Sequence, residues 1–213
     1  MRTKFKAWAE PYINEHPEVS LLEEEIKQLD NFYLEIGSGK GDFIVQMANK
    51  FPKLKFVGIE KNVTCAGFCY KKIVTSGVKN AKMLFNDATN VTPLIKDKSV
   101  NIIFLNFSDP WPKVRHHKRR LTSEKFLKEY LRILKDDGKI IFKTDNVDLF
   151  EYSIEMLPLN GFKIVSKDSN YDGLEEFDAQ TEYETSFRKE GVPINRLVVV
   201  KAWLIVMDFL ITI

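Results

Sequence analysis

The chain has 213 residues, 44% of them hydrophobic, and a formal net charge of +2. This size and apolar content suit one domain with a substantial core, and the near-neutral charge excludes a globally basic nucleic-acid coat protein. Positive charge still gathers at Arg2, Lys4 and Lys6 and in residues 113–120, and negative charge at 168–184. A local basic tract suffices for phosphate contacts, although a solvated charged loop has the same composition.

Short apolar runs alternate along the chain with segments of helical periodicity. In chain order the pattern predicts a strand at 31–36, a helix at 41–50, a strand at 54–60, a helix at 63–76 closed by Gly77, strands at 81–86 and 100–106, a helix from Thr122 or Ser123 to Gly138, a strand at 139–143, a helix at 147–157 stopped by Pro158, and last strands at 162–166 and 196–203. Such strand–helix repeats predict an α/β domain with a mostly parallel sheet and helices on both faces. The polar segment 168–190 is predicted as a long loop, a kind that is often functional.

The two cysteines, Cys65 and Cys69, are spaced to share one face of a helix. Metal binding needs more ligands than these two supply, so no metal site is expected. Lys72 stands where a Cys-x3-Cys-x2-Cys cluster would need its third cysteine. We expect both thiols as buried, small apolar side chains. This cysteine usage, without a secretory signal, favours a reducing cytoplasm.

A glycine-rich loop follows the first strand and has the form Gly-x-Gly-x-Gly, with an acid two residues ahead, in Glu35, Gly37, Gly39 and Gly41. The spacing matches neither a P-loop nor the dinucleotide fingerprint G-x-G-x-x-G. The acid disfavours a pyrophosphate and suits a cationic ligand, such as the ammonium and sulfonium groups of S-adenosylmethionine. An NAD-type dehydrogenase is the alternative for this half of the chain, because Glu60 at the end of the next strand also suits an NAD ribose.

Acids also follow the next two strands, Glu60 at the end of one and Asp87 just after the other. The carboxyl ends of parallel strands meet at one edge of a sheet, where ligands bind. We expect Glu60 to accept hydrogen bonds from ribose hydroxyls and Asp87 to accept one from an adenine amine. Each acid alone is typical of a surface residue, whereas three at successive strand ends predict a site.

The strand at 100–106 leads into an acid, an indole and two prolines, and then directly into the basic tract, in the order Ser108-Asp109-Pro110-Trp111-Pro112-Lys113. The prolines end the strand and stiffen the loop, which sets Asp109 beside a surface suited to a polyanion. Trp111 either stacks on an extruded base or plugs the core beneath the loop. Asp109 could instead cap the Pro110 turn, and Asp145 could cap the helix that follows it.

Together these motifs resemble the bacterial tRNA (guanine-N7-)-methyltransferases, and so do residues 142–146, 181–184 and the pattern Arg-x-Lys-x-x-x-Trp-Ala at 2–9. The resemblance covers residues 1–203. It implies a Rossmann-like class I methyltransferase fold, with a seven-stranded, mostly parallel sheet, helices on both faces and an antiparallel last strand. We accordingly divide the chain into a basic arm and helical segment at 1–30, an S-adenosylmethionine-dependent methyltransferase domain at 31–203 and an apolar tail of unknown role at 204–213.

The resemblance also implies roles for individual residues by motif position. S-adenosylmethionine, with S-adenosylhomocysteine as product, would be bound by Glu35, Gly37, Gly39, Gly41, Glu60, Asp87 and Asp109. The substrate guanosine would be held by Lys113, Asp145, Thr181, Glu182, Tyr183 and Glu184. The RNA would be contacted by Arg115, His116, His117, Lys118, Arg119 and Arg120.

The implied reaction is methylation of guanine N7 in the variable loop of tRNA by a cytoplasmic enzyme, a monomer or homodimer that uses no metal and no membrane. Guanine N7 carries a free lone pair, so no proton has to be removed, and positioning and electrostatics should dominate catalysis. Asp109 is the candidate catalytic carboxylate that stabilises the developing purinium, with Asp145 second. A class I methyltransferase acting on another RNA position or a small molecule, and a tRNA-binding protein without activity, are the alternatives.

Two segments depart from the family pattern. Residues 20–30 are short and acidic where relatives carry a longer basic stretch, which questions any tRNA contact there. Residues 204–213 are nearly all apolar but too short to span a membrane. We interpret that tail as a strand extension, a dimer contact or an aberrant terminus.

Overall fold

The strands form where the sequence has its short apolar runs, and the seven strands in the described part of the chain join one sheet. The computed structural model describes residues 3–173 and 175–202. The strand order is β3-β2-β1-β4-β5-β7-β6. The first five strands pair in parallel, and β7 runs antiparallel to both β5 and β6. The predicted mostly parallel sheet with an antiparallel last strand is confirmed.

The elements alternate along the chain much as the hydrophobic pattern predicts. The strands are β1 (Phe32–Ile36), β2 (Phe56–Glu60), β3 (Ala81–Phe85), β4 (Val100–Asn106), β5 (Leu134–Thr144), β6 (Phe162–Asp168) and β7 (Asn195–Lys201). The helices are α1 (Ala9–Glu15), α2 (Glu23–Gln28), α3 (Asp42–Lys50), α4 (Val63–Ser76), α5 (Ala88–Val91), α6 (Glu124–Ile133), α7 (Val147–Leu159) and α8 (Glu182–Lys189), with 3₁₀ turns η1 (Thr92–Leu94) and η2 (Val114–Arg119).

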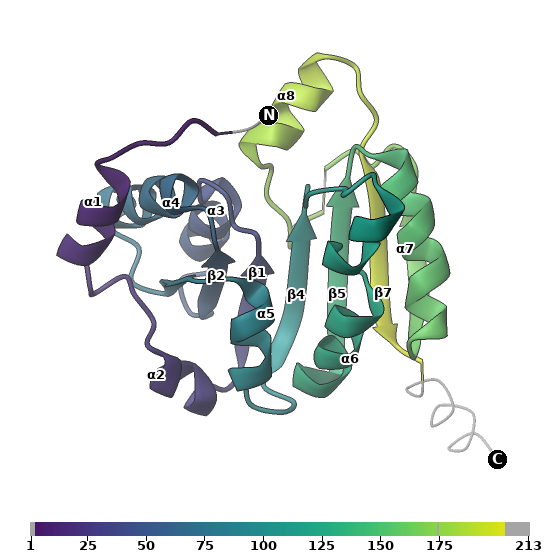
Figure 1. Cartoon of the computed structure of the whole chain (residues 1–213), viewed down its shortest axis with the longest axis horizontal. Helices are drawn as coiled ribbons and strands as arrows, with labels where there is room; N and C mark the ends of the chain where they lie inside the picture. The colour runs from purple at the N-terminus through teal and green to yellow at the C-terminus, as the bar shows by residue number, and fades with distance from the viewer. Residues whose placement is uncertain (1–2, 174, 203–213) are drawn as a thin grey trace.

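Helices cover both faces of the sheet (Figure 1). One core packs strand residues such as Leu34 and Phe142 against α2, α5, α6 and α7. The other packs alternate strand residues such as Phe104 against α1, α3 and α4. Because side chains alternate along a strand, Glu35 and Asn106 point to the face covered by α3 and α4.

The largest differences from the predictions concern α6, α7 and the polar segment 168–190. Helix α6 ends at Ile133, not at Gly138, because Leu134 already pairs with Val100 and the chain continues as β5. Helix α7 runs through Pro158 to Leu159. A proline removes one backbone hydrogen bond of the helix, but in the last turn no further turns follow that it could disrupt. The polar segment predicted as a loop contains α8.

The N-terminal segment is packed on the domain from Thr3 onward. The backbone N–H of Lys6 donates to Thr64 Oγ1 at 3.0 Å. Ala9 is fully buried against Gly67 of α4, where a Cβ on the glycine would lie 2.5 Å from the Ala9 Cβ. Arg2 and the apolar tail at 204–213 lie outside the described residues.

Candidate functional site

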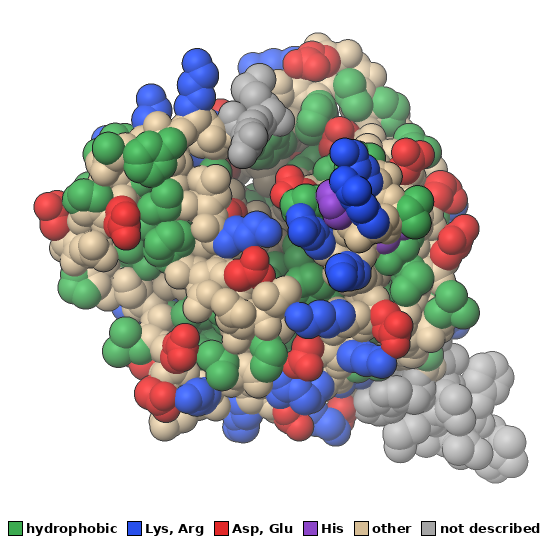
Figure 2. All heavy atoms as spheres, in the orientation of Figure 1, with side chains coloured by type: hydrophobic (Ala, Val, Ile, Leu, Met, Phe, Trp, Pro, Cys, Tyr) green, Lys and Arg blue, Asp and Glu red, His purple; other side chains and the backbone are tan. Residues whose placement is uncertain are grey.

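The candidate site lies at the carboxyl ends of β1, β2, β3 and β4. Of the four predicted acids, Glu35 and Glu60 lie in the last two positions of their strands, and Asp87 and Asp109 follow theirs. Figure 2 shows the surface hollowed at this end of the sheet, with Lys and Arg side chains gathered along one side. Because neighbouring parallel strands end side by side, the fold brings residues that are distant in the sequence together at one edge of the sheet.

The glycine loop turns tightly between β1 and α3. Gly37, Gly39 and Gly41 all have positive φ, at 80°, 55° and 84°, a conformation that glycine adopts without strain. A Cβ on Gly41 would lie 2.5 Å from Cys69 Sγ, so this glycine also permits the close approach of α4. Cβ atoms on Gly37 and Gly39 would meet no described atom within 4 Å, which leaves that side of the loop open to a ligand.

Glu35 is buried and hydrogen-bonded to the neighbouring strand. Its Oε1 accepts from Asn106 Nδ2 at 3.0 Å. Glu35 Oε2 and Asn106 Oδ1 are also buried and have no hydrogen-bond partner among the described residues. Burial raises the pKa of Glu35 to about 8. A buried acceptor without a donor is costly, so this pair of oxygens has the capacity to bind a cationic donor.

Glu60 is engaged with the backbone of the site. Its Oε2 accepts from Gly39 N at 2.9 Å and its Oε1 from Asn62 N at 2.7 Å. Burial raises the pKa of this carboxyl. The acid expected at a ribose therefore also fixes the glycine loop against β2.

Asp87 begins α5 as its N-cap. Its Oδ1 accepts from the backbone N–H and from the hydroxyl of Thr89, both at 2.9 Å. Its Oδ2 lies 3.6 Å from Lys61 Nζ at the surface. The carboxylate remains part-exposed at the end of β3, beside the site.

Asp109 stands in a constrained loop. Phe107 and Trp111 on either side have positive φ, at 51° and 42°, an unusual conformation for large side chains. Arg120 Nε donates to Pro110 O at 2.8 Å and so fixes the loop to the buried Arg120 side chain. The Asp109 carboxylate is exposed, and nothing in residues 3–173 and 175–202 hydrogen-bonds it, so it does not cap the Pro110 turn.

Trp111 is half-buried at the surface, and the interpretation as a core plug is wrong. The Arg119 guanidinium lies 5.0 Å and Lys61 Nζ 5.7 Å from its ring centroid. The His116 ring meets it edge-on at 5.8 Å. One aromatic ring among cations is a suitable surface for a base and its phosphates.

The predicted RNA-binding tract folds as η2. Lys113, Arg115, Lys118 and Arg119 are exposed there, and the two histidines are half-buried. Arg120 differs from the prediction, because it is 3% exposed and its guanidinium stacks 4.4 Å from the Tyr152 ring centroid. Its bond to Pro110 makes it a support of the Asp109 loop.

Asp145 follows β5 and is half-buried. The helix behind it is capped by its neighbour, because Asn146 Oδ1 accepts from Leu149 N at 2.8 Å. The interpretation of Asp145 as the helix cap is therefore wrong, and its carboxylate is left near the strand ends.

The predicted substrate segment 181–184 begins α8. Thr181 caps the helix by accepting from Glu184 N at 3.0 Å. Glu182 forms an ion pair with Lys40 of the glycine loop at 3.0 Å, and Tyr183 is half-buried with a pKa raised by burial. Glu184, in contrast, is fully buried and paired with Lys143 at 2.8 Å. In this structure its carboxylate has no exposed surface to offer a substrate.

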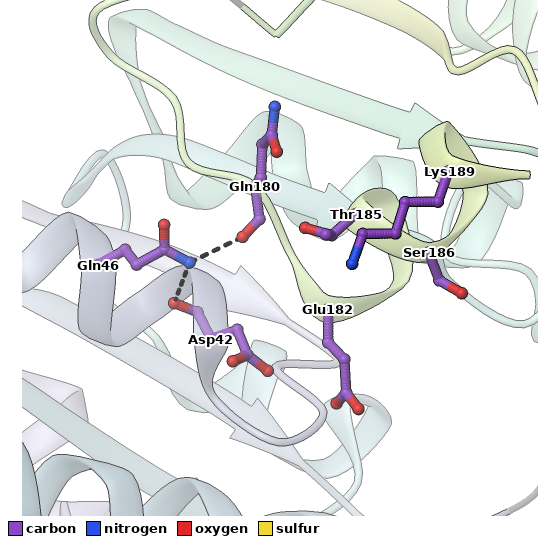
Figure 3. Close-up of a pocket in the computed structure, with 7 residues that line it drawn as sticks. All are labelled: Asp42, Gln46, Gln180, Glu182, Thr185, Ser186 and Lys189. Carbon is purple, nitrogen blue, oxygen red and sulfur yellow. Dashed lines mark hydrogen bonds between the residues drawn. The ribbon is translucent and has the colours of Figure 1, made fainter. Parts of the chain in front are cut away.

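A pocket of about 380 Å³ lies between α3 and α8 (Figure 3). Gln46 Nε2 donates across it to Gln180 O at 2.7 Å and also donates to Asp42 O, one turn earlier in α3, at 3.1 Å. It is lined by Asp42, Gln46, Gln180, Glu182, Thr185, Ser186 and Lys189. Of the predicted site residues, Glu182 alone lines it.

Sequence reasoning missed Asn106, Lys143 and Arg196. Each is a polar residue next to an apolar run of its strand, Asn106 and Lys143 after the run and Arg196 before it, and that pattern is the signal that could have identified them. Cys65 and Cys69 are buried and free, as predicted. Within the described residues no group of three or more His, Cys, Asp or Glu side chains could hold a metal ion, and no helix there is long and apolar enough to cross a membrane.

The family described as putative methyltransferase matches residues 30–197. The chain is 41% identical over 206 residues to the tRNA (guanine-N(7)-)-methyltransferase of Staphylococcus epidermidis, covering 92% of this chain and 96% of that protein. The chain belongs to this methyltransferase family. The namesake enzyme of Lactobacillus johnsonii is 41% identical, with 91% of this chain and 96% of that protein covered.

Solved structures show the same fold at low identity. A 16S rRNA methyltransferase superposes with a TM-score of 0.64 at 13% identity, covering 85% of this chain and 95% of that chain. An antibiotic-related methyltransferase gives a TM-score of 0.61 at 18% identity, covering 85% and 94%. The class I methyltransferase fold that the resemblance implied is thus confirmed.

Proposed function

We propose that this chain transfers the methyl group of S-adenosylmethionine to N7 of a guanine in the variable loop of tRNA. The observation that carries this proposal is that one edge of the sheet holds both a buried pair of acceptors and an exposed carboxylate next to cations. The buried Glu35–Asn106 pair has acceptors to spare for a cationic ligand, and the unbonded Asp109 carboxylate stands beside the exposed cations of η2. The named relatives, matched over nearly their whole length, give the substrate.

The residues at the glycine loop fit S-adenosylmethionine. Glu35 Oε2 and Asn106 Oδ1 would hold its ammonium group, because both are buried acceptors without a donor. Glu60 and Asp87 would hold the ribose and the adenine with the acceptor capacity that their bonds to Gly39, Asn62 and Thr89 leave. When bound, the cofactor supplies an electrophilic methyl group on a sulfonium sulfur.

The proposed methyl transfer requires no general acid or general base from this chain. Guanine N7 attacks with its own lone pair, no proton leaves, and positive charge develops on the purine. Asp109 would stabilise that charge, and the stiff loop between Phe107 and Trp111 would hold its carboxylate in place without reorganisation. Asp145 would serve the base from the end of β5, by accepting from guanine N–H groups or by stabilising the same charge.

The RNA would lie along η2. Lys113, Arg115, Lys118 and Arg119 would bind phosphates, and Trp111 would offer its ring to a base. The half-buried histidines would extend the surface. Arg120 would act through the Asp109 loop, because its guanidinium is already bound to Pro110 and Tyr152.

The test is methyl transfer from labelled S-adenosylmethionine to an unmodified tRNA transcript, with nucleoside analysis and mapping of the label. A transcript with adenines in place of the variable-loop guanines is the control. N7-methylguanosine at the variable loop in the first transcript only is expected. Label in another nucleoside overturns the substrate, and cofactor binding by calorimetry without transfer overturns the enzymatic function.

A further inference from the structure

Buried polar side chains form a row across the carboxyl end of the sheet. Asn106 of β4 is in register with Lys143 of β5, and Lys143 is in register with Arg196 of β7. Lys143 is 0% exposed and Arg196 1%. Lysine and arginine are almost never this deeply buried unless they are paired. The row therefore needs anionic partners. Asp168 of the adjacent strand β6 lies 3.7 Å from Arg196 Nη1, and a more distant segment supplies the others.

Lys143 is satisfied by the segment that leads into α8. Its Nζ donates to both carboxylate oxygens of Asp178 at 2.9 and 3.0 Å, to Ala179 O at 3.1 Å and to Glu184 Oε2 at 2.8 Å. Arg188 binds the other oxygen of Glu184 at 2.7 Å. Two cations and two anions make the cluster neutral.

Arg196 binds the same segment at a second point. Its Nη2 pairs with Glu175, and its guanidinium stacks 4.6 Å from the Tyr171 ring centroid. Phe177 adds an apolar anchor, with its ring 4.6 Å from that of Phe51 and 5.3 Å from that of Tyr33. Buried charges on the sheet, together with the rings of Tyr33 and Phe51, thus fix residues 175–184.

Helix α8, which continues from the fixed segment, contacts both the Asp109 loop and the glycine loop. Phe187 of α8 packs at 5.8 Å on Phe107, which adjoins the Asp109 loop. The Phe107 backbone N–H in turn donates to the carbonyl of Lys143 at 2.8 Å. On the other side, Glu182 binds Lys40 of the glycine loop.

We propose that Lys143 and Arg196 are positioning residues that hold residues 175–189 in place as the substrate-binding wall, and that Glu184 is a buried tether of this wall instead of a ligand of the guanosine. The proposal rests on the proposed function, since the wall is defined by the substrate it faces. Thr181, Glu182 and Tyr183 remain as the residues of the motif with exposed atoms for the substrate.

A double-mutant cycle separates a tether from a ligand. The variants are Lys143→Met, Glu184→Gln and the two combined, with Lys128→Met as control, because Lys128 forms an exposed pair with Glu124. If Glu184 acts through Lys143, each single variant should lower kcat/KM for tRNA at least about tenfold, mainly by raising KM. The kcat/KM of the double variant should then be no lower than that of the less active single variant. Glu184→Gln should keep its affinity for S-adenosylhomocysteine within about twofold.

Limited proteolysis gives a readout that does not need activity. Lys143→Met and Arg196→Met should be cleaved within 168–190 at least about tenfold faster than the wild type, and Lys128→Met should not. If Lys143→Met fails to fold, the near-isosteric Asp178→Asn and Glu184→Gln carry the same test. The proposal would be overturned if the fold-losses of kcat/KM in Lys143→Met and Glu184→Gln multiply in the double variant, or if these variants are cleaved within 168–190 at the wild-type rate. If the wild type methylates no tRNA, the proposed function fails, while the cleavage rates still decide whether the cations are tethers.

Discussion

Asn106 donates its amide Nδ2 to Glu35 Oε1 at 3.0 Å and so joins the carboxyl ends of β4 and β1. The outer oxygen of each side chain is left buried and without a partner among the described residues. The hydrogen bond fixes both side chains before a ligand arrives, and a bound cation would favour the ionised carboxyl, whose free oxygen then acts as an acceptor. Burial of these two oxygens destabilises the folded protein, and the same burial favours the binding of a cationic donor there.

Replacing Glu35 with Gln should separate these two consequences. The amide keeps the side-chain volume but, unlike the carboxyl, cannot release a proton and take up the negative charge that a bound ammonium group favours. We expect affinity for S-adenosylhomocysteine to fall about 100-fold, because a charge-assisted hydrogen bond is worth about 1.5–3 kcal/mol. Titration calorimetry measures this, and an unchanged Kd would remove Glu35 from the cofactor site.

The stability of the wild type should depend on pH through the same residue. Burial raises the pKa of Glu35 from 4.5 to about 8 in the folded protein. Between these values the folded chain holds a proton that the unfolded chain has released, so the free energy of unfolding should decrease as pH rises from about 4.5 to about 8. Urea unfolding of the wild type and Glu35→Gln across this window tests the sign; the variant should lack this decline, and parallel curves would contradict it.

Asp109→Ala should lose catalysis without losing the cofactor. The carboxylate has no hydrogen-bond partner within the described residues, so its removal should not disturb the loop. We expect kcat to fall by about 10²–10³, the usual effect of removing one electrostatic group from a transition state, and the Kd of S-adenosylhomocysteine to change less than about threefold. Single-turnover rates and calorimetry measure the two, and near-wild-type turnover would exclude Asp109 from the chemistry.

Arg115 and Arg120 belong to one basic tract but should behave differently. Arg115 is exposed on η2, so Arg115→Ala should weaken tRNA binding and reduce the slope of log K against log salt by about one. Arg120→Ala should leave that slope unchanged and lower the stability of the protein by about 1–3 kcal/mol, because it removes a buried side chain and its hydrogen bond to Pro110. Filter binding over a salt series and thermal unfolding distinguish them; equal salt slopes for both variants would refute the distinction.

Local sequence patterns determined the order of the elements and the edge of the sheet that carries the site. Apolar runs gave the strands, the glycines after Glu35 gave the tight turn into α3, and the prolines around Trp111 gave the stiff loop. These features depend on neighbours in the chain, so they can be recognised without the fold. Gly138 is the counterexample, because strand pairing between Val100 and Leu134 outweighed its local preference for a helix end.

Only the tertiary structure decided which charges face solvent and which hold the molecule together. Glu184 and Arg120 carry charges that the sequence assigned to substrate and RNA, yet the fold buries both. Lys143 meets Asp178 and Glu184 across 35 and 41 residues of chain, and Asn106 meets Glu35 across 71. Such pairs depend on strand order and register, which no local pattern encodes, because burial requires that each charge find its partner wherever the chain brings it.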